Sequence, residues 1–500
     1  MRSFELLLYL SNISLFVLTV VFKKGQRIIP VCFASGIAAV LLVIHLTVEG
    51  YRVQLFFPYC ITVIFLAISG YSYFKKSSFQ KIPRFLLGSA YTAIAIMLVG
   101  TAVLMYAFPV FKLPELSGKF KVGTQTFHFV DTNREEIFDK ARDGKRELMV
   151  QVWYPSQAGS GKRTSFIPDT RILSYMAANY GLPGFTFQHL KYVSSHAYSE
   201  AAISTAQTSY PLILANPGNG SSRLLHTSQA ESLASHGYIV AMIDHTYNTF
   251  ATEFPDGRIT TSTTNDLFSP DHDYRTESRN RDKLGKVLTD DVVFVLDQFE
   301  LIQSGQIPSH LKGWIDLDHV GVFGHSIGGA TAYDAAYDPR IAVGIDLDGG
   351  LYRLREREGL RKPFLFLNSE SYFEKLKMVM DNRVYTDAEI NRMGSNREWE
   401  DQVTEDKKLE LERMRKTVDE GGQVLYIENT EHLNFTDVQF ISPIFKMLGI
   451  TGKIEPNRAD SITNTYMLNF FDMYLKNQDG ILMKGPDSRF PEVKFVTSLF

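Results

Sequence analysis

The sequence predicts an α/β fold with a mainly parallel, doubly wound sheet, preceded by four transmembrane helices. Two observations carry this prediction: long apolar runs fill residues 1–110, and short apolar runs alternate with helix-like segments after about residue 210. The 500 residues also exceed what one ordinary core holds. We expect a membrane segment over 1–110, a linker over 111–122 and a large α/β domain over 123–500.

The four apolar runs each match the length of a helix that crosses a bilayer. They cover about 4–22, 28–48, 55–74 and 85–110, and a crossing helix needs roughly 20 residues. The first run could instead be a signal peptide, because Arg2 precedes it. Three further runs and the absence of a small-residue cleavage site in the sequence favour a span. Polar residues within the runs are few, so we interpret the segment as an anchor in the lipid bilayer.

Basic residues between the runs predict the orientation of the anchor. The first loop contains Lys23, Lys24 and Arg27, and the third contains Lys75, Lys76, Lys81 and Arg84, whereas the second has only Glu49 and Arg52. Because basic loops stay in the cytoplasm, the first and third loops should be cytoplasmic. We therefore expect a multi-pass protein of the cell membrane with the α/β domain on the extracytoplasmic side.

Charge and cysteine content exclude some function classes. Residues 1–110 carry nine Lys and Arg against Glu5 and Glu49, while the whole chain has a net charge of −3, so the rest of the chain is acidic. An acidic domain without a basic stripe is a poor candidate for binding nucleic acid. The two cysteines, Cys32 and Cys60, both lie in apolar runs. The large domain therefore has neither a disulfide framework nor a cysteine-based metal site.

Apolar periodicity predicts the elements of the large domain. Alternation over 124–130 and 148–154 indicates an antiparallel pair at a sheet edge. Continuous apolar runs predict buried strands at 211–215, 238–243, 320–323, 341–347, 363–367 and 424–427, with helices at 282–303 and 463–475. A charge-dense excursion over about 374–420 interrupts this order. We interpret it as a solvated surface helix without a catalytic part, with a lid over the site as the alternative.

A Gly-x-Ser-x-Gly motif follows the 320–323 run. Its residues are Gly324-His325-Ser326-Ile327-Gly328, and Gly329, Ala330 and Ala332 come next. A serine on a sharp turn between a strand and a helix projects its hydroxyl, which is the nucleophile elbow of α/β-hydrolases. The alternative is a glycine-rich structural turn. Because a strand precedes the motif and small residues follow it, we predict that Ser326 is a nucleophile.

A serine nucleophile needs a base and an acid that orients the base. His432 is the only histidine after Ser326, and it follows the 424–427 strand, where this fold places its base. Asp346 and Asp348 both end the 341–347 strand, and alternation puts them on the same side, so periodicity does not choose between them. Asp348 is favoured because it is nearer the carboxyl end of the strand and precedes Gly349-Gly350; Asp346 would then be a structural group.

The oxyanion of an acyl-transfer intermediate needs two backbone N–H donors. Ile327, directly after the nucleophile, is the first candidate. The second is Asn219, in the loop after the 211–215 strand, where Gly218 and Gly220 keep the backbone accessible. A simple glycine turn is the alternative for this loop.

These motifs together resemble the platelet-activating-factor acetylhydrolases of the lipoprotein-associated and intracellular type. Residues 324–331 are similar to that family's Gly-His-Ser-Phe-Gly-Gly-Ala-Thr, 344–348 to its acid strand, and 432–437 to its His-x-Asn-Phe-x-Asp. The resemblance covers about 120–450 and implies an α/β-hydrolase fold with Ser326, Asp348 and His432 as the triad. The chain departs from the family in its Pro217-Gly218-Asn219-Gly220 loop, its long excursion and its anchor.

The sequence thus predicts a membrane-anchored serine carboxylic ester hydrolase without cofactor or metal. The resemblance implies that it cleaves short or oxidised acyl groups from phospholipids or simpler esters. Two alternatives stay open: an acyltransferase that uses the same triad, and an inactive hydrolase fold that serves as a binding or sensor domain. The presence of all three triad residues argues against the inactive form.

Overall fold

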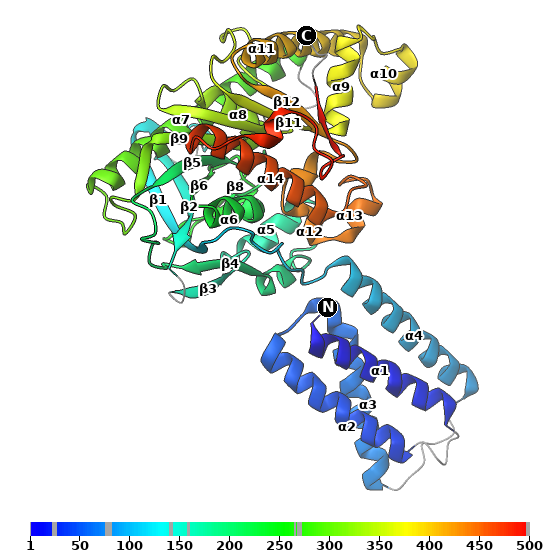
Figure 1. The fold of residues 1–500 in the computed structure, drawn as a ribbon. Helices are drawn as coiled ribbons and strands as arrows, with labels where there is room; N and C mark the ends of the chain where they lie inside the picture. Colours follow the sequence, from blue (N-terminus) through cyan, green and yellow to red (C-terminus); the bar gives the residue numbers. More distant parts are fainter. Residues whose placement is uncertain are drawn as a thin grey trace.

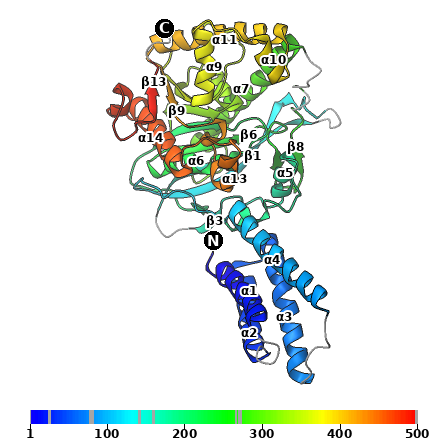
Figure 2. The same ribbon diagram turned by 90° about the vertical axis from the view of Figure 1, so that its right-hand side faces the viewer.

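The computed structural model describes residues 2–22, 28–75, 83–139, 144–157, 161–264, 267 and 273–496. The chain forms a helical bundle and a larger α/β domain, which meet where α4 ends (Figure 1). A view turned by 90° shows the bundle projecting from one side of that domain (Figure 2).

Within the described residues, the bundle has four helices that are long and apolar enough to cross a membrane. They run over Ser3–Val21, Ile29–Glu49, Val53–Phe74 and Arg84–Ala107. Their α-helices are α1 (Ser3–Val21), α2 (Ile28–Ile44), α3 (Phe56–Lys75) and α4 (Arg84–Ala107). Large apolar side chains point outward from them; Ile29 and Phe85 are 79% and 80% exposed. The N-terminus and the α/β domain lie at the same end of the bundle (Figure 1). Most of the basic loop residues that predict the orientation fall in 23–27 and 76–82, outside the described residues.

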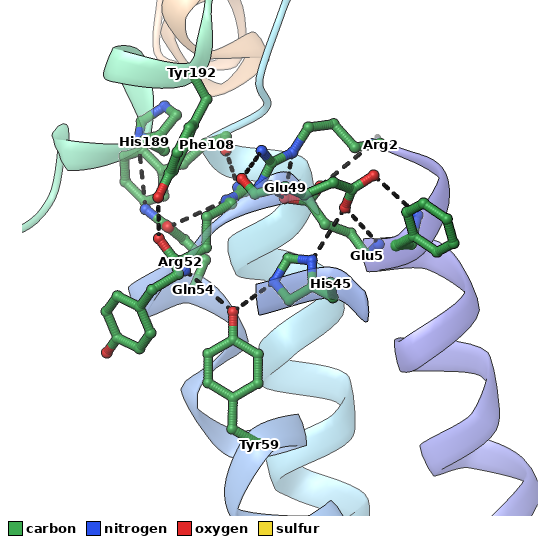
Figure 3. Close-up of polar contacts among 12 residues, drawn as sticks. Arg2, Glu5, His45, Glu49, Arg52, Gln54, Tyr59, Phe108, His189 and Tyr192 are labelled. Atoms are coloured by element: carbon green, nitrogen blue, oxygen red, sulfur yellow. Dashed lines mark hydrogen bonds and ion pairs between the residues drawn. The ribbon is translucent and has the colours of Figure 1, made fainter. Parts of the chain in front are cut away.

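A buried polar network closes the end of the bundle nearest the α/β domain (Figure 3). The Arg52 guanidinium forms an ion pair with Glu5 at 2.9 Å, and both side chains are almost completely buried. Arg52 also donates a hydrogen bond to the backbone carbonyl of Phe108, at the end of α4. The Gln54 amide donates to the carbonyl of Thr186 in the α/β domain at 3.2 Å. These contacts tie the second loop of the bundle to the rest of the chain.

The linker after α4 packs against the α/β domain instead of hanging free. The Phe111 ring stacks on Phe440, with centroids 5.9 Å apart, and Leu113 is 4% exposed. Both belong to an apolar cluster with α5 (Ile172–Asn179) and the end of α4. The expected linker over 111–122 is therefore docked at its start, because its first residues are apolar.

The α/β domain is built on a sheet of eleven strands within the described residues, in the order β13-β12-β11-β10-β9-β5-β6-β2-β1-β4-β3. The central run from β6 to β12 is parallel. Its strands are β5 (Tyr210–Asn216), β6 (Ile239–Asp244), β9 (Ile315–His325), β10 (Ile341–Leu347), β11 (Phe364–Ser369) and β12 (Gln423–Ile427). A mainly parallel sheet is confirmed, and its central strands are almost wholly buried, as their unbroken apolar runs predict.

Helices cover both faces of this sheet (Figure 1). One apolar core contains side chains from α7 (Tyr274–Ser304), α8 (Ile327–Ala335), α9 (Glu370–Met380) and α11 (Arg397–Asp419). The other contains side chains from α6 (Thr227–Ser235) and α14 (Pro456–Leu475). Smaller elements of this domain include α10 (Asp387–Met393), α12 (Val438–Ile441), α13 (Pro443–Met447) and a hairpin of β7 (Ala251–Glu253) and β8 (Ile259–Thr261).

The sequence-based prediction of a sheet edge is wrong in one respect. The expected antiparallel pair exists as β1 (Lys121–Glu135) and β2 (Lys145–Ser156), but it is not at the edge. Two short strands, β4 (Ser194–Ser199) and β3 (Lys162–Ser165), continue the sheet beyond β1. They are short and polar, so no apolar alternation marks them. At the other edge, β13 (Val493–Phe495) pairs antiparallel with β12 and was likewise not predicted.

The Arg52–Glu5 ion pair should make a measurable contribution to the stability of the whole protein. Replacing Arg52 by Met removes one partner of a buried carboxylate, a change that costs about 3–5 kcal/mol where the charge is left unpaired; Arg2 also contacts Glu5 and reduces the loss. We expect Arg52→Met to lower the midpoint of thermal unfolding of the full-length protein in detergent. Adding Glu5→Gln should lower it less than the sum of the single effects. The exposed Arg84 offers the control Arg84→Met, and strictly additive effects would contradict the coupling.

Candidate active site

Ser326 stands on a strained turn between β9 and α8. Its backbone has φ 58° and ψ −127°, a conformation that residues other than glycine rarely adopt. The turn is held because the Ser326 N–H donates to the carbonyl of Leu347, at the end of the neighbouring strand β10, at 3.0 Å. The first turn of α8 begins directly after it at Ile327. The strand, turn and helix of the predicted nucleophile elbow are therefore present.

The glycines around Ser326 allow α8 to approach the strand ends closely. A Cβ atom on Gly324 would lie 2.0 Å from the carbonyl oxygen of Gly328, and one on Gly328 would lie 2.2 Å from that of Asn216. A Cβ atom on Gly329 would lie 1.8 Å from the Asp346 carboxylate. Real Cβ atoms do not approach other atoms this closely, so a larger residue at these positions would move the turn.

The structure brings His432 and Asp348 together. The Nδ1 atom of His432 is 2.6 Å from the Asp348 carboxylate, and the other carboxylate oxygen accepts the N–H of Ser369 at 2.5 Å. Asp348 is buried, whereas the imidazole is about half exposed. His432 opens the short helix η6 (His432–Phe435), which follows β12. A buried acid thus orients a histidine whose ring is open to solvent.

Asp346 has a different environment from Asp348. One of its carboxylate oxygens accepts the N–H of Gly349 at 2.8 Å, and the other has no partner among the described residues. Burial raises the pKa of this carboxyl well above its usual range. Asp346 lies under the elbow and against Gly329, so its role is to fill the space below the turn.

Sequence reasoning missed the part of His325. Burial lowers the pKa of its imidazole well below the usual range, so the ring is neutral. Its Nε2 lies 3.0 Å from the backbone carbonyl of His432, to which it donates, and the two rings have centroids 4.5 Å apart. His325 therefore holds the backbone of η6 beside the elbow. His325 directly precedes Ser326 in the motif, and the sequence analysis gave it no role of its own.

The loop after β5 runs alongside the elbow. A Cβ atom on Gly218 would lie 3.2 Å from the Cβ of Ser326, and Asn219 lines the same cavity as Ser326 and Ile327. The Asn219 side chain accepts a hydrogen bond from Thr264 at 3.1 Å. The two candidate oxyanion donors, Ile327 and Asn219, therefore line the same cavity as Ser326.

A buried polar chain supports this loop from below. The Asn216 amide donates to the carbonyl of Phe323, near the end of β9, at 3.1 Å. Its oxygen is 3.1 Å from Nε2 of His245, whose Nδ1 is 2.9 Å from Asp291. Arg146 in turn pairs with Asp291 through two hydrogen bonds. Sequence reasoning missed this chain because its members are far apart in the sequence and have no common motif.

A cavity of about 420 Å³ opens in front of Ser326. Its walls come from the elbow, the loop after β10, the first turns of α7 and one side of α11. Trp399 of α11 lies in this wall, with its ring edge-on to Tyr274 of α7 at 5.2 Å. The 374–420 excursion contains the expected helix, α11, and one side of this helix lines the cavity. Within the described ranges, no group of three or more His, Cys, Asp and Glu side chains could hold a metal ion.

The close approach at Gly329 leads to a testable expectation. Gly329→Ala would place a methyl group on the Asp346 carboxylate, and such overpacking costs about 1–3 kcal/mol. We expect a midpoint of thermal unfolding that is several degrees lower than that of the wild type. Gly100→Ala, which has open space around the new methyl, is the control and should not lower it. Equal stability of the Gly329→Ala protein would show that the elbow tolerates a wider spacing.

Comparison with known proteins places the chain in a family. The family model for platelet-activating factor acetylhydrolase, isoform II, matches residues 105–487. A probable 1-alkyl-2-acetylglycerophosphocholine esterase of the fungus Arthroderma benhamiae is 25% identical over 415 residues, which are 77% of this chain and 94% of the relative. The platelet-activating factor acetylhydrolase of Cavia porcellus is 25% identical over 434 residues, covering 82% of this chain and 89% of the relative.

A solved structure is also similar. The ferulic acid esterase of Streptomyces cinnamoneus superposes with a TM-score of 0.57 at 26% identity, and the match covers 78% of this chain and all of the esterase. The resemblance to platelet-activating-factor acetylhydrolases that the motifs indicate is thus confirmed over most of the α/β domain. The chain belongs to the platelet-activating factor acetylhydrolase, isoform II, family.

Proposed function

We propose that this chain is a membrane-anchored serine carboxylic ester hydrolase. The observation that carries the proposal is the hydrogen bond between His432 and Asp348 beside the elbow of Ser326. A buried acid, an oriented imidazole and a strained serine are the parts that acyl transfer to a serine requires. Family membership supports the same reaction type.

In the proposed reaction, the Ser326 hydroxyl attacks the carbonyl carbon of the ester. In neutral His432 the Nδ1–H donates to Asp348, which leaves the Nε2 lone pair to take the hydroxyl proton. Asp348 stabilises the imidazolium that forms. His432 then returns the proton to the leaving alcohol, and an acyl-serine remains. Water, deprotonated by His432, attacks this acyl group and releases the carboxylic acid and free Ser326.

The negative charge on the tetrahedral intermediate requires donors that are already in place. We assign this role to the backbone N–H groups of Ile327 and Asn219, which line the cavity together with Ser326. The Ile327 N–H belongs to the first turn of α8, where N–H groups have no acceptor within the helix. The positive end of the helix dipole adds to the stabilisation.

The proposed substrates are short-chain esters or acyl esters of phospholipids. A cavity of about 420 Å³ is at the small end of the range for ligand sites, which supports a small acyl group or a polar head. The relatives are an esterase of alkyl-acetyl-glycerophosphocholine and an acetylhydrolase of platelet-activating factor by name. We extend this substrate class to the present chain.

Labelling with a fluorophosphonate tests the triad. The probe phosphonylates an activated serine, so Ser326→Ala should abolish labelling. His432→Ala and Asp348→Asn should reduce hydrolysis of p-nitrophenyl acetate by about four orders of magnitude. His319→Ala, on the exposed part of β9, is the control and should label like the wild type. Equal labelling of the Ser326→Ala and wild-type proteins would remove the proposal.

We also propose that α1 to α4 cross the membrane, with the α/β domain outside the cytoplasm. Their length, apolar composition and outward apolar side chains support the crossing. The basic residues of the first and third loops support the orientation. The end of α13 adds exposed apolar surface next to α4, since Met447 and Leu448 are 74% and 68% exposed. This arrangement would place the site near esters that reside in the bilayer.

Protease added to intact cells tests the orientation. If the α/β domain is outside, the protease should remove a tag placed after Phe500 while a cytoplasmic marker stays intact. The same tag should be protected if the domain is inside, and full protection would refute the proposed topology. Permeabilised cells serve as the control, because the tag is then accessible in either orientation.

A further inference from the structure

The cavity in front of Ser326 contains a basic side chain, Arg281, that interacts with the Tyr274 side chain and forms a long ion pair with Glu277. Arg281 of α7 lines this cavity. Its guanidinium is 4.0 Å from the Glu277 carboxylate, which is too long for a hydrogen bond. It also lies 5.7 Å from the centre of the Tyr274 ring. The side chain is 33% exposed, so a ligand in the cavity can reach it.

Two acidic side chains of the same wall are already engaged. Asp406 accepts hydrogen bonds from Arg355 at 2.6 Å and from the Tyr274 hydroxyl at 2.7 Å, one on each carboxylate oxygen. Glu410 pairs with the Lys407 ammonium at 2.8 Å. These pairs account for two of the three carboxylates in the wall, and the third is Glu277, 4.0 Å from Arg281. The guanidinium of Arg281, with five N–H donors, is therefore the cation best able to bind a new partner.

We propose that Arg281 binds an anionic oxygen group of the ester while the ester carbonyl lies at Ser326. A planar guanidinium matches a phosphate or a carboxylate through two parallel hydrogen bonds. Because both residues line one cavity of about 420 Å³, the anionic group belongs a few bonds from the ester carbonyl. This inference rests on the proposed hydrolase function and makes Arg281 a determinant of substrate specificity.

Two parts of an ester could supply this anion. One is the phosphodiester of a phospholipid, on the alcohol side of the scissile bond. The other is a carboxylate at the far end of a short acyl chain, on the acyl side. Both have the same oxyanion chemistry, and substrates that carry only one of them separate the two sources.

The test compares the wild type and Arg281→Gln on two pairs of substrates. The first pair is an acetylated ether phospholipid and the corresponding alkyl-acetyl-glycerol, which lacks the phosphate. The second pair is the p-nitrophenyl half-ester of glutarate and p-nitrophenyl pentanoate. We expect kcat/KM of the variant to fall about tenfold or more on the anionic member of at least one pair, since a hydrogen bond to a charged group contributes about 1.5–3 kcal/mol. The neutral members should change by less than about twofold, because they do not contact the guanidinium.

The pattern of loss identifies the anion. A fall on the phospholipid alone assigns the phosphate, and a fall on the glutarate ester alone assigns the carboxylate. Arg281→Lys should recover part of the loss, since it keeps the charge but not the two parallel hydrogen bonds. Arg279→Gln is the matched control, because Arg279 is on the same helix, exposed and outside the cavity wall. An equal loss on neutral and anionic esters, or no loss on either anionic ester, would overturn the proposal.

A binding measurement decides the question without turnover. Calorimetry with glycerophosphocholine and with glutarate should show at least one ligand that binds the wild type more tightly than Arg281→Gln. If each ligand has the same affinity for the wild type and for the variant, the proposal is overturned. Hydrolysis of the neutral esters by the wild type tests the hydrolase function separately. If the protein binds these anions through Arg281 but cleaves no ester, the anion site is supported and the proposed hydrolase function is contradicted.

Discussion

The constraint on which the α/β domain depends is the close approach of α8 to the ends of β5, β9 and β10. Ser326 is held in a strained conformation because its N–H is bonded to β10 and because Gly328 and Gly329 leave no gap beneath the helix. Strain of this kind costs about 1–3 kcal/mol and persists only where the surroundings enforce it. Here the ends of β5, β9 and β10 together enforce the conformation of Ser326. The Asp346 side chain fills the remaining space against Gly329.

Local signals in the sequence were sufficient for the elbow and for the parallel strands. The strand before Ser326 and the small residues after it lie in one short window, whereas His432 was identified as the only histidine in the sequence after Ser326. Periodicity did not distinguish Asp346 from Asp348, and Asp348 was favoured because it is nearer the carboxyl end of the strand. Asp348 has φ 58° just after β10 ends, so it leaves the strand geometry on which the alternation argument depends. The family motif and the hydrogen bond between His432 and Asp348 support the same choice.

The cavity wall shows a second limit of sequence reasoning. The many charged residues of α11 predict a solvent-facing helix, because burying an unpaired charge is unfavourable in free energy. In the structure, Asp406 and Glu410 are buried, but their partners Arg355 and Lys407 neutralise them. Arg355 is distant from Asp406 in the sequence, so no local pattern could predict this ion pair. The same difficulty explains why the chain from Arg146 to Asn216 was missed.

The contacts between the bundle and the α/β domain also involve the segment that contains His432. Phe440, a few residues after His432, stacks on Phe111 just beyond α4, and the N–H of Asp437 donates to the carbonyl of Leu225 in the same apolar cluster. The segment that contains His432 is therefore bounded on one side by His325 of the elbow and on the other by the start of the linker. A bundle that docks through Gln54 and this linker restricts how the α/β domain can turn against it. If the bundle lies in a bilayer, the orientation of the cavity in front of Ser326 to the lipid surface follows from packing at the junction, whereas a free polar linker would leave that orientation undetermined.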